Sequence, residues 1–279
     1  MIAYANGFLV KIMQSIPYIF EFRNCLILVR SKGNDIWVTV MKNEYGFLAG
    51  ICRDLGIELS SGQLDQFRRF ADLLLEKNKV MNLTAITELH DVMIRHFYDS
   101  LTLVKAVDLS SAWQVIDVGT GAGFPGIPVK ISFPALSVTL MDALSKRVHF
   151  LDEVIEACEL DQIKTIHARA EDLARDDTCR EKFDLAVSRA VANMSVLAEY
   201  TLPFVKTGGI LCAYKSGNIE EELKGASRAL QILGGNVESV CRFTLPEEAG
   251  ERTLVTIRKT TTTPKTYPRK AGLPGRKPL

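Results

Sequence analysis

Apolar residues follow two different periods along this chain. From residue 113 onward, short apolar runs alternate with stretches in which apolar residues recur every three or four positions, as they do on one face of a helix. The strand-like runs cover residues 113–118, 137–142, 163–167, 183–187, 209–214, 237–243 and 253–258. Strands that alternate with helices predict βαβ units with right-handed crossovers, and therefore a mostly parallel α/β sheet.

Two segments depart from that alternation. The last two runs are joined by a short loop with Pro246 and Gly250, so we expect an antiparallel pair at the edge of the sheet. Residues 44–106 have a helical period throughout, and Ser60 and Gln63 have the spacing of a capping box that starts one of these helices. The pattern thus predicts a helical N-terminal part before the sheet.

The segment 115–126, Val-Ile-Asp-Val-Gly-Thr-Gly-Ala-Gly-Phe-Pro-Gly, is an apolar strand that opens onto four glycines. Glycine adopts positive φ values and lets a ligand lie against the backbone, because it has no Cβ atom. In an open parallel sheet this loop follows the carboxyl end of the first strand, where ligands bind. The segment therefore predicts a loop that holds a nucleotide-like cofactor.

Two classes of cofactor fit this loop. Residues 121–126 match G-x-G-x-x-G, and Asp142 ends the next strand, where an acid could hold ribose hydroxyls. Those features suit a nicotinamide-dependent oxidoreductase. However, Pro125 and Pro128 crowd the turn in which a dinucleotide fold starts an uninterrupted helix facing the pyrophosphate. Asp117-x-Gly119-x-Gly121-x-Gly123 instead resembles the loop of Rossmann-like S-adenosylmethionine-dependent methyltransferases, which we favour.

The composition excludes several other classes. Of the 279 residues, 47% are apolar and 24% charged, which is ordinary for a globular protein, and no apolar run is as long as a membrane span. The N-terminus has no basic segment followed by a clean apolar stretch, so it does not resemble a secretory signal. The six cysteines form no C-x-x-C pair and the four histidines lack metal-ligand spacing. We expect a cytoplasmic protein with no membrane segment and no metal, and a monomer.

Charge is distributed unevenly. Residues 258–279 contain seven Lys or Arg and no acid, whereas residues 41–257 carry 23 basic and 31 acidic residues. A basic terminus predicts contact with a polyanion at one edge of the protein. The alternative is a solvated terminus that binds nothing.

Seven motifs occur in an order that resembles one known family. They are Asn82-Leu83-Thr84-Ala85-Ile86, His96-Phe97-Tyr98-Asp99-Ser100-Leu101, residues 117–128, Lys146-Arg147-Val148-His149-Phe150-Leu151, Arg169-Ala170-Glu171, Ser188-Arg189-Ala190-Val191-Ala192 and Tyr267-Pro268-Arg269-Lys270-Ala271-Gly272. Together they resemble the bacterial small-subunit (16S) ribosomal RNA (guanine-N7)-methyltransferase family, also called glucose-inhibited division protein B. The resemblance covers about residues 41–279.

The resemblance implies a fold and a division of the chain. We expect a Rossmann-like methyltransferase fold with a seven-stranded, mostly parallel sheet, an antiparallel edge strand and an N-terminal helical subdomain. Residues 1–40 would be an extension that the family lacks, 41–110 a helical cap, 111–258 the methyltransferase core and 259–279 a basic tail. Translation starting at Met41 would yield a chain without the extension.

The resemblance also implies roles for individual residues. The methyl donor, S-adenosylmethionine, would rest its amino-acid end on the loop, its ribose on an acid and its adenine against a third strand. The cofactor-binding set is Gly119, Gly121, Gly123, Phe124, Asp142, Ala170, Glu171 and Arg189. Simpler readings exist, since Glu171 could be a helix N-terminal acid, Asp142 a turn residue and Arg189 an ion-pair partner.

The same resemblance implies ribosomal RNA, free or in a ribosomal particle, as the partner. The basic residues that we expect to contact RNA are Lys146, Arg147, Lys215, Arg269 and Lys270. Guanine N7 has a lone pair and no proton, so we expect no general base, and Arg189 is predicted to position the acceptor at the boundary with the cofactor. His96 and Asn82 stay outside the catalytic set, because a lone histidine is more often satisfied locally. A catalytically inactive ribosome-binding protein remains a third possibility.

Overall fold

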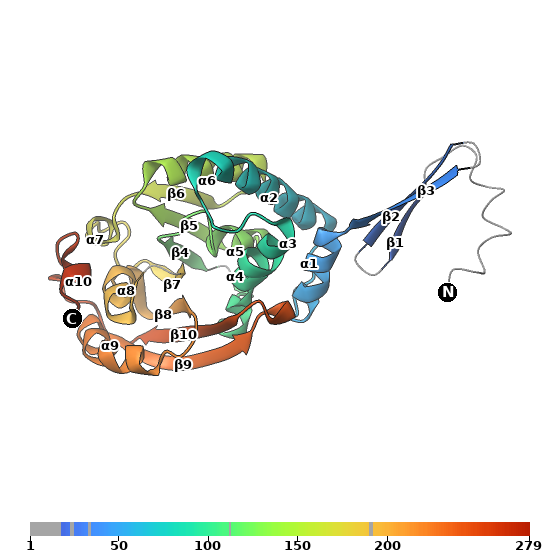
Figure 1. The fold of residues 1–279 in the computed structure, drawn as a ribbon. Coiled ribbons are helices and arrows are strands. Elements are labelled where there is room, and N and C mark those ends of the chain that lie inside the picture. The colour runs from blue at the N-terminus through green and yellow to red at the C-terminus, as the bar shows by residue number, and fades with distance from the viewer. Residues whose placement is uncertain (1–17, 23–24, 33–34, 112, 190–191) are drawn as a thin grey trace.

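A computed structural model describes residues 18–22, 25–32, 35–111, 113–189 and 192–279. Residues 1–17, 23–24 and 33–34 of the expected N-terminal extension lie outside the described residues. Within residues 18–42, β1 (Tyr18–Phe22), β2 (Cys25–Lys32) and β3 (Asp35–Lys42) form an antiparallel three-stranded sheet. This sheet is separate from the large one that follows (Figure 1).

Helices occupy most of the next segment, as the period predicted. They are α1 (Glu44–Arg53), α2 (Ser61–Met81), α3 (Leu89–Asp91), the π-helix η1 (Val92–Tyr98), α4 (Asp99–Leu101) and the 3-10 helix η2 (Thr102–Lys105). The capping box of α2 is confirmed, since Ser60 Oγ accepts from Gln63 N and Gln63 Oε1 accepts from Ser60 N. The period did not reveal the widened π turns of η1.

The large sheet has seven strands, which lie close to the predicted runs. They are β4 (Gln114–Val118), β5 (Ser137–Asp142), β6 (Ile163–His167), β7 (Phe183–Arg189), β8 (Val205–Lys215), β9 (Gly235–Thr244) and β10 (Glu251–Lys259). Their order is β6-β5-β4-β7-β8-β10-β9. The expected antiparallel pair lies at the β9 edge. The one reversed strand is β10, which lies one position inside the edge and pairs antiparallel with both β8 and β9.

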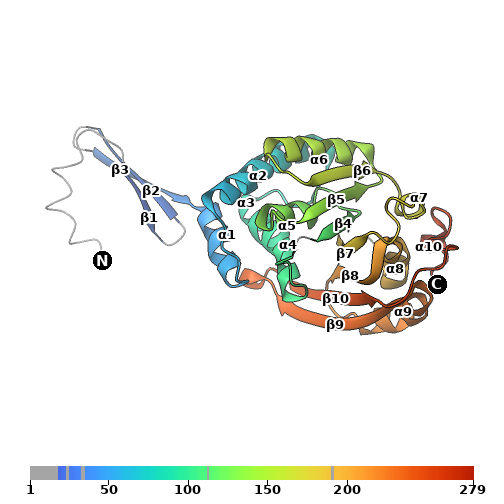
Figure 2. The same ribbon diagram turned by 180° about the vertical axis from the view of Figure 1, so that it is seen from behind.

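Helices cover both faces of this sheet, as Figures 1 and 2 show from opposite sides. The remaining helices are α5 (Gly126–Ser132), α6 (Ser145–Ala157), α7 (Ala170–Leu173), α8 (Met194–Thr201), η3 (Leu202–Phe204), α9 (Glu220–Leu233), η4 (Pro246–Glu248) and α10 (Leu273–Arg276). Successive strand residues point to opposite faces, so Val115 joins the apolar cluster under α2, α5 and α6, and Ile116 joins the cluster under α8 and α9. The N-terminal helices share the first of these clusters with the sheet, through side chains such as Phe67 and Phe97.

The strand order places the predicted site. From β4 the chain adds β5 and β6 on one side of the sheet, and later β7 and β8 on the other. Ligands of open parallel sheets bind outside the carboxyl ends of the strands at this point of reversal. Gly119 follows β4, Asp142 ends β5 and Arg189 ends β7, so all three lie at the same edge.

The C-terminal segment after β10 is held against the domain. Glu199, which is fully buried on α8, accepts from the backbone N, Nε and Nη2 of Arg269, with Nη2 at 2.6 Å. Glu171 on α7 accepts from Gly272 N at 2.9 Å. Arg180 donates to the carbonyl oxygens of Thr263 and Tyr267. The described part of the basic tail is therefore anchored by buried and half-buried polar groups.

Candidate methyltransferase site

The glycine loop has the backbone that the motif predicted. Gly119, Gly121 and Gly123 all have positive φ values, of 72°, 63° and 96°. A Cβ atom added to Gly121 would meet no atom within 4 Å, so this residue borders open space. A Cβ atom on Gly123 would lie 2.5 Å from the Cδ1 atom of Ile127. Gly121 thus leaves room for a ligand, whereas Gly123 lets the loop pack on the next helix.

That helix is short, as the two prolines predicted. α5 begins only at Gly126, after Pro125 as its N-cap, and has seven residues. Its first backbone N–H donates to Asp117 Oδ2 at 2.8 Å, and Thr120 Oγ1 donates to the same oxygen at 2.7 Å. Asp117 is fully buried, and burial raises the pKa of its carboxyl to about 6. The Asp117 carboxyl, near the end of β4, therefore holds the glycine loop through its hydrogen bonds to Thr120 and Gly126.

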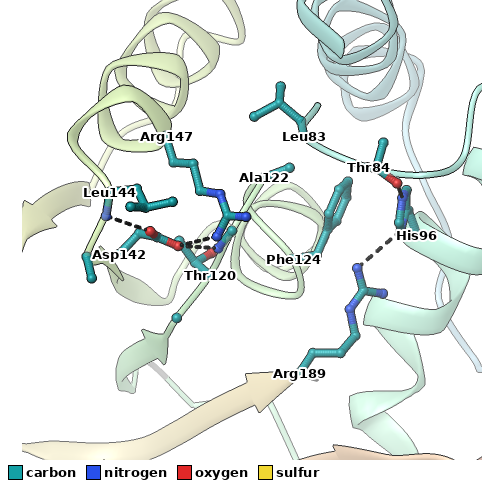
Figure 3. Close-up of a pocket in the computed structure, with 13 residues that line it drawn as sticks. Leu83, Thr84, His96, Thr120, Ala122, Phe124, Asp142, Leu144, Arg147 and Arg189 are labelled. Atoms are coloured by element: carbon teal, nitrogen blue, oxygen red, sulfur yellow. Dashed lines mark hydrogen bonds and ion pairs between the residues drawn. The ribbon is translucent and has the colours of Figure 1, made fainter. Parts of the chain in front are cut away.

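A cavity of about 460 Å³ opens beside this loop (Figure 3). It is lined by Leu83, Thr84, His96, Gly119, Thr120, Gly121, Ala122, Phe124, Asp142, Ala143, Leu144, Arg147 and Arg189. Five residues of the predicted cofactor set are among them, namely Gly119, Gly121, Phe124, Asp142 and Arg189. Gly123, Ala170 and Glu171 are not, and Glu171 holds Gly272 of the C-terminal segment.

Asp142 lies on one side of the cavity. Its Oδ2 accepts from Gly121 N at 3.0 Å and lies 3.4 Å from Nη1 of Arg147, while Oδ1 accepts from Leu144 N at 2.9 Å. An ionised carboxylate has about four acceptor positions, so these bonds leave capacity for hydroxyl donors. Arg147, one of the residues that we expect to contact RNA, lines this cavity and lies beside Asp142.

The opposite wall is built by His96, Phe124 and Arg189 (Figure 3). The His96 ring stacks on Phe124 with centroids 4.4 Å apart, and the Arg189 guanidinium carbon lies 5.0 Å from the centroid of the same ring. Arg189 Nη2 donates to His96 Nδ1 at 3.2 Å, so Nε2 carries the proton and donates to Thr84 Oγ1 at 2.7 Å. Burial and the neighbouring Arg189 lower the pKa of His96 to about 3. His96 is therefore a neutral acceptor for Arg189.

A buried carboxylate holds Arg189 from behind. Asp99, whose side chain is 2% exposed, lies 3.1 Å from Nη1 of Arg189 and 3.1 Å from Nε of Arg252. Arg189 Nη1 also donates to the carbonyl oxygen of Arg95 in η1. With so many partners, Arg189 is fixed in one orientation at the end of β7.

A second cavity of about 680 Å³ lies beyond this wall. It is lined by Ile86, Arg95, His96, Asp99, Arg189, Ala192, Asn193, Tyr214, Lys215, Ser216, Glu222 and Arg252. His96 and Arg189 line both cavities and so form their boundary. Lys215 Nζ donates to Ala192 O and to Glu222 Oε1, both at 2.6 Å. Lys215, whose side chain is 12% exposed, thus lines this second cavity.

The other basic residues of the predicted RNA-binding set differ in their surroundings. Lys146 on α6 and Lys270 are exposed. Arg269 is bound by Glu199, so its guanidinium already has a partner. Among the residues that the structure describes, there is no group of three or more metal-binding side chains. No described helix is long and apolar enough to cross a membrane.

Sequence reasoning missed several residues of this site. Thr84, His96, Asp99 and Arg252 come from a loop, the π-helix η1, helix α4 and β10, and they meet only because these elements pack together. The motifs that contain Leu83, Thr84, His96 and Asp99 were visible in the sequence. The role of Arg252 had no sequence signal.

Seven strands in this order, one reversed strand beside the edge, and a glycine loop with an acid at the end of the next strand define the Rossmann-like methyltransferase class. A comparison with family models identifies the family within that class. The family model described as rRNA small subunit methyltransferase G matches residues 63–254, and the chain belongs to this family.

Curated relatives align with most of this chain. Ribosomal RNA small subunit methyltransferase G of Lachnoclostridium phytofermentans is 51% identical over 239 residues, which are 86% of this chain and 98% of that protein. The protein of the same name from Leuconostoc citreum is 49% identical over 81% of this chain and 95% of that protein. A crystal structure of precorrin-6y C5,15-methyltransferase from Geobacter metallireducens is 16% identical, with a TM-score of 0.42 over 57% of this chain and 88% of that chain.

Proposed function

We propose that this protein transfers a methyl group from S-adenosylmethionine to N7 of a guanine in small-subunit (16S) ribosomal RNA, and that it does so in the cytoplasm. The observation that carries the proposal is the first cavity, in which the glycine loop, Asp142 and Arg189 face one space at the reversal point of the sheet. Family membership supplies the class of RNA.

The residues of this cavity fit the proposed methyl donor. Gly119 and Gly121 offer backbone without a Cβ atom to its amino-acid end, and Asp142 offers acceptor capacity to ribose hydroxyls. When bound, S-adenosylmethionine supplies an electrophilic methyl group. Ala170 and Glu171 remain proposed adenine contacts, and there Glu171 would have to share its carboxylate with Gly272 N.

The chain need not supply a general base for this reaction. Guanine N7 attacks through an in-plane lone pair, so one N–C bond forms, the S–C bond to the methyl group breaks, and no proton moves. Arg189 should therefore donate to O6 or to a phosphate, because a donor on N7 would occupy the attacking lone pair. Cys212 is an unsuitable nucleophile for a C5 methylation, since it is fully buried on β8 and burial raises the pKa of its thiol.

Exposed cations offer contacts for the RNA backbone. We propose Lys146 and Lys270 as phosphate contacts, since both are exposed and neither holds a buried carboxylate. Arg147 and Arg269 are weaker candidates because Asp142 and Glu199 hold them. Replacing Lys146 and Lys270 together should make the salt dependence of RNA binding shallower by about 1.4 units on single-stranded RNA.

A turnover assay tests the reaction. The purified protein, radiolabelled S-adenosylmethionine and small-subunit RNA should yield labelled RNA whose modified base is 7-methylguanine by mass mapping. A label on an exocyclic amine would refute the proposed chemistry. Binding of S-adenosylmethionine without turnover on RNA or particles would favour the inactive ribosome-binding protein, and retention of NAD instead would favour the oxidoreductase.

A further inference from the structure

The second cavity has the composition of a site for a charged ligand. Its walls carry four cationic side chains and two carboxylates, namely Arg95, Arg189, Lys215 and Arg252 with Asp99 and Glu222. Its volume of about 680 Å³ lies within the range of roughly 300–1,000 Å³ that small-molecule sites occupy. Arg189 and Arg252 share Asp99, Lys215 pairs with Glu222, and Arg95 pairs with Asp91. Four cations thus face three carboxylates, and this excess of one positive charge favours an anionic ligand.

The position of this cavity identifies the part of the reaction that it could serve. Because His96 and Arg189 line both cavities, a group bound in the second lies next to the first across that wall. The wall includes residues of the π-helix η1, a type of helix that is frequent at functional sites. The adjoining ligand would therefore be the methyl acceptor.

We propose that the second cavity holds a single guanine nucleotide that has left its stack, from a single-stranded or looped part of the RNA. This inference rests on the proposed function. N7 of a paired guanine lies in the deep, narrow major groove of an A-form helix, where side chains cannot reach it. Enzymes that react with a base commonly extrude it into a pocket, at the lowest cost where the base is unpaired.

The polar groups of the cavity match this ligand. Arg252 and Lys215 offset the phosphate charge, and the Arg189 guanidinium offers donors to O6 of guanine. Adenine carries an amino group at that position, so two sets of donors would face each other. Glu222, 30% exposed at the side chain, is an acceptor for the N–H groups at the other edge of guanine. The cavity therefore favours guanine over adenine.

Arg252→Gln tests the proposal with a matched control on the same strand. Arg252 pairs with Asp99 near the start of β10, and Arg258 pairs with Glu238 near its end. Arg252→Gln should lower kcat/KM for small-subunit RNA at least about tenfold and leave the Kd of S-adenosylmethionine within about twofold. Arg258→Gln should leave both values unchanged. Loss of cofactor affinity in step with RNA activity would overturn the proposal.

A second variant blocks the cavity without changing its charge. Ile86 is half-buried in the loop before α3, and its backbone N–H donates to Thr84 Oγ1 whatever the side chain. Ile86→Trp should reduce RNA methylation as Arg252→Gln does, whereas Val80→Trp, at an exposed position of α2 that lines neither cavity, should not. If Arg252→Gln and Ile86→Trp both keep the wild-type kcat/KM, the acceptor does not bind here.

A binding measurement separates this inference from the proposed reaction. In saturation-transfer NMR, guanosine 5′-monophosphate should bind the wild-type protein more strongly than adenosine 5′-monophosphate, and Ile86→Trp should abolish the difference. A wild-type protein that binds the guanine nucleotide but methylates no RNA would refute the proposed function and keep the pocket. Equal binding of both nucleotides, or a mapped target guanine inside a continuous base-paired stem, would overturn the inference.

Discussion

His96 should make the protein lose stability as the pH falls. The imidazole is 9% exposed, accepts from Arg189 and has a pKa of about 3, against 6.5 for an ordinary histidine. Between these values the unfolded chain binds a proton that the folded protein refuses, so the free energy of unfolding falls as the pH drops through this window. The contribution is fully present above about pH 6.5. The protein is thus sensitive to acid because His96 is buried as a neutral ring between Thr84 and Arg189.

The size of the effect follows from the two pKa values. pH 5 lies 1.5 units below the pKa of the unfolded imidazole, which is therefore protonated, whereas the folded imidazole is still neutral. The free energy of unfolding is then about 2 kcal/mol lower at pH 5 than at pH 8. If the whole window were crossed, the loss would approach about 5 kcal/mol. His96→Gln removes the titrating group, so its stability should fall by about 2 kcal/mol less than that of the wild type between pH 8 and pH 5.

Urea unfolding at four pH values from 5 to 8 measures this difference. His149→Gln is the control, because His149 is exposed on α6. That variant should follow the wild-type curve. Equal pH slopes for the wild type and His96→Gln, or an imidazole NMR titration of His96 near pH 6.5 in the folded protein, would refute the assignment of a buried neutral ring.

Three further predictions concern the loop, the strand-end acid and the C-terminal anchor. Gly121→Val should abolish binding of S-adenosylmethionine by calorimetry with little change in melting temperature, because φ is +63° and the Cβ atom would enter the cavity; normal affinity would remove the donor from this loop. Asp142→Asn should weaken the donor by about 1.5–3 kcal/mol and RNA much less, since an amide presents N–H donors where the ribose needs acceptors; an unchanged Kd would place the ribose elsewhere. Arg269→Met should lower the free energy of unfolding by about 3–5 kcal/mol, because Glu199 would be a buried charge without its partner. The exposed neighbour offers the control, as Lys270→Met should change stability by less than about 0.5 kcal/mol, and equal effects would contradict the anchor.

The sequence was sufficient for features set by local pattern. Alternating apolar runs determined the seven strands, and the capping box fixed the start of α2. The glycines of the loop and the two prolines determined the backbone of residues 119–126, because these residue types restrict φ wherever they occur. The motifs in their order indicated the family, which is shown.

Tertiary packing decided what no local pattern encodes. The reversed strand is β10, which lies between β8 and β9. The sequence did not predict this position, because the order in which strands pair depends on contacts between residues far apart in the chain. Arg252 reaches Asp99 across 153 residues of sequence, and Arg189 reaches His96 across 93. Arg147 pairs with Asp142 and Arg269 pairs with Glu199, and neither partner could be predicted from the sequence. The sequence gives the charge of a residue but not its partner. The partner is determined by the elements that pack around the residue, because a buried charge without a partner is costly.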